Sequence, residues 1–217
     1  DLQPVFPENW SPVCAAFGLT RQNFEVSEAM GYSRDLCGYL RNIIGYVHGM
    51  MGKEGNPLGG HPEPDLLLPP LGGCAPVMKI FQVLERRFPD AKVFRGDIPQ
   101  VAIENIKRHH IDYAVSEMKR LIAFLEEATG RRFDYDRLKE TVILSDKACE
   151  LWDEIMSFRK YIPTPISASE IGIMFVMVTR QGTKVAVDYL TRVRDELRER
   201  AEGGIGVIEN EKVRLFW

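Results

Sequence analysis

The sequence predicts an α/β protein in which a short parallel sheet is followed by a long helical region. Two apolar runs, residues 66–68 and 91–94, lie on either side of an amphipathic segment at residues 76–87. This strand, helix, strand order is typical of neighbouring parallel strands. From residue 103 onward the apolar residues recur with the period of a helix instead.

The composition is that of an ordinary soluble protein. The chain has 217 residues, 45% of them hydrophobic and 27% charged, and its formal net charge is -3, so no basic excess indicates nucleic-acid binding. The apolar run at residues 171–178 is far shorter than the roughly 20 residues of a membrane-spanning helix. Nothing at the N-terminus resembles a signal peptide, and we expect a cytoplasmic protein.

The first expected elements are an extended lead-in at residues 1–12 and a short helix at residues 13–17, in which Cys14 is expected to be a small buried hydrophobe. A longer helix follows within residues 31–51, capped by Ser33 or Asp35. Its expected buried face consists of Leu36, Leu40, Ile43, Ile44 and Val47. Cys37 falls in its first turn, and the charged side chains beside it are expected to be solvated. They are Arg34, Asp35 and Arg41.

The stretch at residues 65–81 has the sequence DLLLPPLGGCAPVMKIF. An apolar run stops at two prolines, a Gly-Gly turn follows, and Cys74 comes directly before the helix predicted at residues 76–87. Ligands of open α/β sheets bind outside the carboxyl ends of the strands, near helix N-termini. Helix N-termini also favour the thiolate form of cysteine, which is the form that binds metal. The preceding Gly- and Pro-rich linker, residues 52–64, contains His61, which we expect to be solvated.

The later part of the chain is predicted to be helical, with His109 and His110 on the surface ahead of its first helix. Four helices are expected, at residues 113–129, 137–161, 170–179 and 184–200. The apolar stripe of the first consists of Val115, Met118, Leu121, Ile122 and Leu125. The inward residues of the second are Leu138, Val142, Leu144, Leu151, Ile155 and Phe158.

The candidate chemistry rests on cysteine. The sequence contains no P-loop, GxGxxG, HExxH, GxSxG or CxxC motif. Four cysteines are too few for a disulfide framework in a chain of this size, which leaves reduced thiols or metal ligands. Cys37 and Cys74 each lie at a helix start after a glycine-containing turn, and are a candidate pair of metal ligands. Such thiolates suit an iron–sulfur site, which normally needs more than two cysteines.

Several runs resemble the 2-hydroxyacyl-CoA dehydratase and benzoyl-CoA reductase family, in the family's own order over nearly the whole chain. These runs are GYSRDLCGYLRNIIGY, PDLLLPPLGGC, YAVSEMKRLIAFLEEATGRRFDYDRLKETV, LWDEIMSFRKYIPTPIS, GTKVAVDYLTRVRDELRER and GIGVIENEKVRLFW. The resemblance implies two flavodoxin-like α/β lobes with helical additions. It also implies a [4Fe-4S] cluster held by three cysteines, of which the first two match Cys37 and Cys74. The third is expected outside this sequence.

On this basis we expect an α/β lobe at residues 1–102 that carries both cysteines, a helical segment at residues 103–204, and the start of a second α/β lobe at residues 205–217. The sequence starts at Asp1 without methionine, and residues 213–217 resemble a buried strand with no loop after it. We therefore expect a partial chain whose second lobe is truncated.

The resemblance further implies an oxygen-sensitive heterodimer of homologous subunits acting on an acyl-CoA. An ATP-dependent iron–sulfur activator protein would supply electrons of low potential. The first run, GYSRDLCGYLRNIIGY, is more similar to benzoyl-CoA reductase subunits, so the resemblance favours a benzoyl-CoA reductase. A 2-hydroxyacyl-CoA dehydratase is the alternative. The family's acidic residue after a proline has no match near Ser11 and Pro12, so no catalytic acid or base is assigned.

Two other classes of function remain open. The chain could be a noncatalytic structural subunit with inert cysteines that pairs with an active one. A flavin-binding module is suggested only by analogy with the flavodoxin-like topology, and ranks last.

Overall fold

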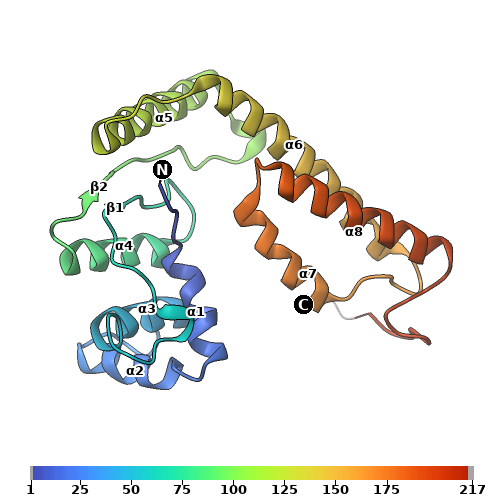
Figure 1. Cartoon of the computed structure of the whole chain (residues 1–217), viewed down its shortest axis with the longest axis horizontal. Helices are drawn as coiled ribbons and strands as arrows, with labels where there is room; N and C mark the ends of the chain where they lie inside the picture. The colour runs from blue at the N-terminus through green and yellow to red at the C-terminus, as the bar shows by residue number, and fades with distance from the viewer. Residues whose placement is uncertain (1, 215–217) are drawn as a thin grey trace. The chain divides into compact units, whose positions relative to one another are not determined.

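The computed structural model describes residues 2–214, apart from the side chains of residues 173, 175, 176 and 178. The chain divides into two compact units, Asp1–Arg132 and Phe133–Trp217, which are described separately below. Figure 1 shows their elements.

The first unit contains a small parallel sheet and five α-helices. The helices are α1 (Pro7–Ala16), α2 (Thr20–Ala29), α3 (Gly38–Gly49), α4 (Ala75–Arg87) and α5 (Arg108–Thr129), and the strands are β1 (Leu66–Leu67) and β2 (Lys92–Val93). The strands are parallel, with Leu66 opposite Lys92 and Leu67 opposite Val93. The predicted strand, helix, strand order is therefore confirmed. The unit is nevertheless mostly helical, because each strand is only two residues long.

Helix α3 is central to the core of this unit, and it contacts α1, α2 and α4. The core side chains are Cys14, Leu40, Ile43, Ile44, Tyr46, Val47, Leu67, Ile80, Val83, Leu84 and Phe88. The predicted burial of Cys14 and of four of the five residues expected on the α3 face is confirmed. Leu36 is the exception: it is 37% exposed, because α3 begins only at Gly38. The prediction of Ser33 or Asp35 as the cap was therefore wrong, and Cys37 is the N-cap residue.

Helix α2 was absent from the predicted elements because its buried side chains are polar. Asn23 and Ser27 are fully buried. The Asn23 amide donates to the Asn42 side chain at 2.7 Å, and the Asn42 amide donates to the Ser11 carbonyl of α1 at 3.1 Å. Hydrogen bonds thus join the three helices where a hydrophobic pattern would be expected.

The α2 and α3 backbones meet at Gly45. A Cβ atom built on Gly45 would lie 1.8 Å from the Asn23 carbonyl oxygen and 2.4 Å from its carbon. A backbone cannot yield as the end of a flexible side chain can. This close contact therefore requires glycine.

His61 is only partly exposed, so the prediction of a solvated loop histidine was wrong. Its ring makes an edge contact with Trp10, with 6.0 Å between the ring centres. Its backbone N–H donates to the Tyr46 hydroxyl at 2.9 Å, and Nδ1 lies 2.9 Å from the Pro62 carbonyl oxygen. That carbonyl can only accept, so Nδ1 carries a proton. Nε2 is buried without a partner among the described residues.

Helix α5 ends at Gly130, as predicted, in a left-handed conformation. Its Phe124 ring lies 5.5 Å from that of Phe94. The predicted stripe is only partly covered, because Val115 and Met118 are 45% and 40% exposed. Glu117 is buried instead, where it accepts from the Asp97 backbone N–H at 3.2 Å and from Arg120 at 2.5 Å.

The second unit contains α6 (Tyr135–Ser157), α7 (Ala168–Met174) and α8 (Lys184–Glu202). Helices α6 and α8 pack together, and Arg194 of α8 donates to Glu154 of α6 at 2.7 Å. The core side chains are Ala148, Leu151, Ile155, Phe158, Ile166, Met174, Leu190 and Leu197. Leu138 and Val142 were wrongly predicted to face inward and are 41% and 48% exposed, because the buried residues of α6 lie in its second half.

Two further predictions concern the later elements. The helix predicted at residues 170–179 is in fact the short α7 followed by a 3-10 helix, Phe175–Arg180. Residues 205–214 contain no strand, and Val213 is 75% exposed. The rest of the strand predicted at residues 213–217 lies outside the described residues.

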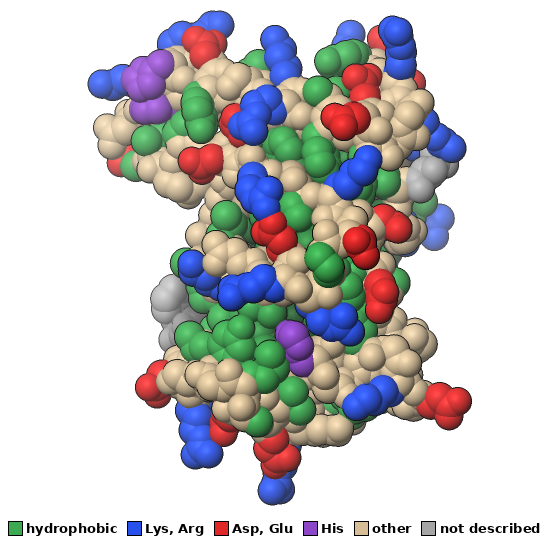
Figure 2. All heavy atoms as spheres, turned by 90° about the vertical axis from the view of Figure 1, so that its left-hand side faces the viewer, with side chains coloured by type: hydrophobic (Ala, Val, Ile, Leu, Met, Phe, Trp, Pro, Cys, Tyr) green, Lys and Arg blue, Asp and Glu red, His purple; other side chains and the backbone are tan. Residues whose placement is uncertain are grey.

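The surface carries both signs of charge. Figure 2 shows basic and acidic side chains interspersed on one face of the molecule. Across the described part of the chain, every helix is too short or too polar to cross a membrane.

We expect Gly45→Ala to lower the free energy of unfolding of the first unit by about 3 kcal/mol or more, since the added methyl group would meet the Asn23 backbone. Gly38→Ala in the same helix is the matched control, because its nearest contact would be an ordinary 3.6 Å to the Phe24 ring. Urea unfolding of both variants measures the effect. Equal stability of the two would contradict the close contact.

We also expect stability to fall as the pH drops below about 6.5, the ordinary histidine pKa. Burial lowers the pKa of His61 in the folded state, so over this range the unfolded chain binds a proton that the folded chain does not. One such group changes the free energy of unfolding by at most about 1.4 kcal/mol per pH unit.

His61→Gln should flatten this dependence. Some slope should remain, because burial and the nearby Arg87 also lower the pKa of His48. Denaturant unfolding at a series of pH values provides the measurement. A slope that His61→Gln leaves unchanged would rule out the proposed titration.

Candidate functional site

The two candidate ligands occupy equivalent positions in the fold. Cys37 is the N-cap residue of α3 and Cys74 is the N-cap residue of α4. The carbonyl of Cys37 accepts the Arg41 N–H at 3.0 Å, and that of Cys74 accepts the Val77 N–H at 3.0 Å. Neither thiol caps its own helix, and both side chains are exposed. Each cysteine therefore stands at the start of a helix with its thiol open to solvent. In the first turn of α4, Pro76 has no N–H and the Val77 N–H is already bonded to the Cys74 carbonyl.

The Cys74 loop leaves the carboxyl end of β1 and packs against the segment that leaves the carboxyl end of β2. The Ile98 N–H donates to the Leu71 carbonyl at 3.0 Å. A Cβ atom on Gly72 would lie 2.1 Å from the Gln100 side-chain nitrogen, and Gly73 has φ of 109°. The positive φ of Gly73 favours glycine at this position, whereas the Gln100 side chain near Gly72 can move aside. The loop thus brings the chain from β1 to Cys74 at the edge where α/β sheets bind ligands.

The Cys37 loop is a tight turn that follows α2. The Leu36 N–H donates to the Ser33 carbonyl at 3.2 Å, and the Asp35 N–H donates to the Ser33 hydroxyl at 3.2 Å. Arg34 and Asp35 are exposed, as predicted. Arg41 is only 8% exposed, so its prediction as part of a solvated face was wrong. Its guanidinium is held by Glu28 and by the Arg34 carbonyl, partners that no helical spacing reveals.

The other two cysteines have different surroundings. Cys14 is fully buried, and burial raises the pKa of its thiol against the weaker opposing effect of a hydrogen bond with Asn23. Such a thiol is inert. Cys149 is exposed on α6 in the second unit, with the Gln181 side-chain nitrogen 3.7 Å from its sulfur.

The donor chemistry fits part of an iron–sulfur site. Helices α3 and α4 are in contact, so the two exposed N-cap thiols belong to one packed helix pair. Within residues 2–214, no group of three or more cysteine, histidine or acidic side chains is gathered as metal ligands. Cys37 and Cys74 can therefore contribute two thiolate ligands, and a complete ligand set needs at least one more donor.

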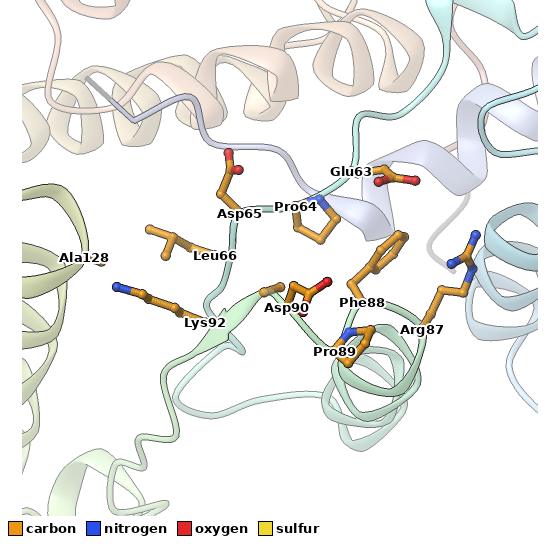
Figure 3. A pocket seen from close by; sticks show the side chains of 11 residues that line it. Glu63, Pro64, Asp65, Leu66, Arg87, Phe88, Pro89, Asp90, Lys92 and Ala128 are labelled. Carbon is orange, nitrogen blue, oxygen red and sulfur yellow. The ribbon is translucent and has the colours of Figure 1, made fainter.

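A separate pocket of about 440 Å³ lies where β1 and β2 begin, at the opposite end of the strands from Cys74 (Figure 3). Its charged lining residues are Glu63, Asp65, Arg87, Asp90 and Lys92. They come from the segment before β1, the end of α4, the turn that follows it and the start of β2, and the sequence analysis assigned none of them to a site. Figure 3 shows Lys92 extending toward Ala128 of α5, with Arg87 on the other side. Because these charges do not converge, the pocket lacks the geometry of a catalytic centre.

The family model described as "2-hydroxyglutaryl-CoA dehydratase, D-component" matches residues 4–217. The (R)-phenyllactyl-CoA dehydratase alpha subunit of Clostridium sporogenes is 29% identical over 212 residues, which cover 97% of this chain and 51% of that protein. A benzoyl-CoA reductase subunit of Thauera aromatica is 32% identical over 200 residues, which cover 87% of this chain and 45% of that protein.

The (R)-2-hydroxyisocaproyl-CoA dehydratase alpha subunit of Clostridioides difficile is 26% identical over 213 residues, which cover 94% of this chain and 49% of that protein. The chain thus spans about half the length of these three relatives. Their names confirm the resemblance drawn from the sequence and indicate a subunit of an enzyme. With nearly every residue matched by the family model, the chain belongs to the family of the 2-hydroxyglutaryl-CoA dehydratase D-component, to which these acyl-CoA dehydratase and benzoyl-CoA reductase subunits are related.

Proposed function

We propose that this chain is the cluster-binding part of a subunit of an oxygen-sensitive acyl-CoA reductase or dehydratase. The observation that carries the proposal is the equivalent placement of Cys37 and Cys74, each exposed at the N-cap of one of two contacting helices. The names of the relatives add the acyl-CoA substrate class and the existence of a partner subunit.

In this proposal Cys37 and Cys74 hold a [4Fe-4S] cluster, with a third cysteine ligand from outside this sequence. The cluster would supply one-electron chemistry at low potential. The residues of this chain would hold it through the two cysteine thiolates at the starts of α3 and α4. Gly73, directly before Cys74, has a φ of 109°, a conformation that favours glycine at this turn.

The remaining features of the proposal follow the family resemblance. The electrons would come from an ATP-dependent iron–sulfur activator protein, and the partner would be a homologous subunit in a heterodimer. The two-stranded parallel sheet would belong to a flavodoxin-like lobe at residues 1–102, ahead of a helical segment at residues 103–204. Residues 205–217 would begin a second lobe.

Two substrate classes are both supported. The 32% identity to a benzoyl-CoA reductase subunit favours reduction of an aromatic acyl-CoA. The family model and the 29% identity to a phenyllactyl-CoA dehydratase subunit favour dehydration of a 2-hydroxyacyl-CoA. The noncatalytic alternative is favoured by cysteines that point apart instead of facing one cavity, or by thiols buried separately in apolar packing. Both thiols are exposed, which argues against the second of these conditions.

We expect Cys37→Ala and Cys74→Ala each to abolish cluster binding, because each removes a thiolate ligand. The measurement is iron and acid-labile sulfide content, with the visible absorption spectrum, on protein prepared without oxygen from the complete reading frame. Cys149→Ala is the matched control, since this cysteine is also exposed but lies in the second unit. A parent protein without iron would favour the noncatalytic alternative.

The substrate class is tested on the complete enzyme with its activator, given benzoyl-CoA in one assay and a 2-hydroxyacyl-CoA in another. Loss of benzoyl-CoA with formation of a ring-reduced thioester would support the reductase. Turnover of the hydroxyacyl thioester alone, to the enoyl thioester, would exclude it in favour of the dehydratase.

A further inference from the structure

Arg41 lies one helical turn after Cys37, and its charged side chain is buried. Only 8% of the residue is exposed. Its backbone N–H donates to the Cys37 carbonyl, in the hydrogen bond that opens α3. A guanidinium out of water is costly unless its charge and its donors are matched. Its contacts therefore indicate what the buried charge does.

The Arg41 guanidinium connects its own helix, α3, to helix α2 and to the loop that contains Arg34. Nη2 donates to the carboxylate of Glu28 on α2, and Nη1 donates to the Arg34 carbonyl at 3.1 Å. The guanidinium carbon also lies 4.0 Å from the centre of the Phe24 ring. Nε is buried without an acceptor among the described residues, so the two Nη groups make the polar contacts. Lysine could not reproduce this planar, two-directional contact.

These contacts fix the loop on both sides of Cys37. Before Cys37, the Arg34 carbonyl is bound by the Arg41 guanidinium. After Cys37, the backbone of the same arginine begins the helix. The Arg34 side chain is 84% exposed and donates to the other carboxylate oxygen of Glu28 at 2.8 Å, and such an exposed ion pair adds little stability.

We propose that Arg41 is a positioning residue for Cys37: anchored on Glu28, it holds the 34–37 backbone so that the Cys37 thiol is presented at the N-terminus of α3. This inference rests on the proposed function, because the ligand that Cys37 would meet is the iron–sulfur cluster. Cys74 is supported differently, by the positive φ of Gly73 and by the segment after β2, whose Ile98 N–H donates to the Leu71 carbonyl.

The first test follows amide hydrogen exchange in Arg41→Lys, on the complete protein. We expect exchange at residues 34–41 to accelerate about tenfold or more, while α4 exchanges as in the parent. Arg21→Lys is the matched control, because Arg21 also pairs with a glutamate of α2, Glu25, but is 91% exposed. Arg34→Ala, which keeps the carbonyl, should also leave exchange near the parental rate. Parental exchange in Arg41→Lys would overturn the inference.

The second test measures iron content and the visible spectrum of the same variants, prepared without oxygen, with far-ultraviolet circular dichroism as the check of folding. We expect Arg41→Lys to lose half or more of its iron while its helix content is retained. If that variant fails to fold, Glu28→Gln decides, with the same direction of change expected. Full iron and an unaltered spectrum in the folded variant would overturn the inference.

The two tests separate this inference from the function on which it rests. A parent protein without iron contradicts the proposed function, and the exchange measurement then still decides whether Arg41 fixes the Cys37 loop. A parent with iron, together with an insensitive Arg41→Lys variant, contradicts the positioning role alone.

Discussion

The architecture of the first unit depends on the close crossing of α2 and α3. Gly45 lets the two backbones touch, and the hydrogen bond between Asn23 and Asn42 fixes how far along each other the helices lie. A slip of one turn would remove the glycine from the contact and leave two buried carboxamides without partners, which is costly. The direction of α3 follows from this crossing, and with it the position of Cys37.

The position of α3 also determines where α4 and the sheet lie. The apolar face of α3 packs against α4, whose own N-cap is Cys74, and α4 connects the two parallel strands. The two candidate ligands thus share one core but depend on different local devices. A buried arginine and its carboxylate support the loop before Cys37, whereas Gly73, with a positive φ, precedes Cys74.

The hydrophobic pattern predicted whatever is held by apolar burial. The parallel strands, the α4 helix, the burial of Cys14 and the C-terminal end of α5 at Gly130 were predicted, because their signals are short apolar runs, helical spacing and a glycine cap. What was missed is polar. Helix α2 has no apolar stripe, because its buried side chains are Asn23 and Ser27. Arg41 is buried by contacts with Glu28 and the Arg34 carbonyl. His61 contacts Trp10 and Tyr46. Periodicity cannot report such contacts, because nothing in the spacing says which polar groups will find partners.

The exposure of the two N-cap thiols has a consequence for how the protein must be handled. Thiolate character and solvent access govern the oxidation of cysteine to sulfenic acid and beyond. Cys14 is protected by the core, but Cys37 and Cys74 are exposed to solvent. When nothing is bound to them, oxidants reach these two sulfurs ahead of the buried one. Damage by air would then remove the candidate ligands while leaving the fold that carries them intact.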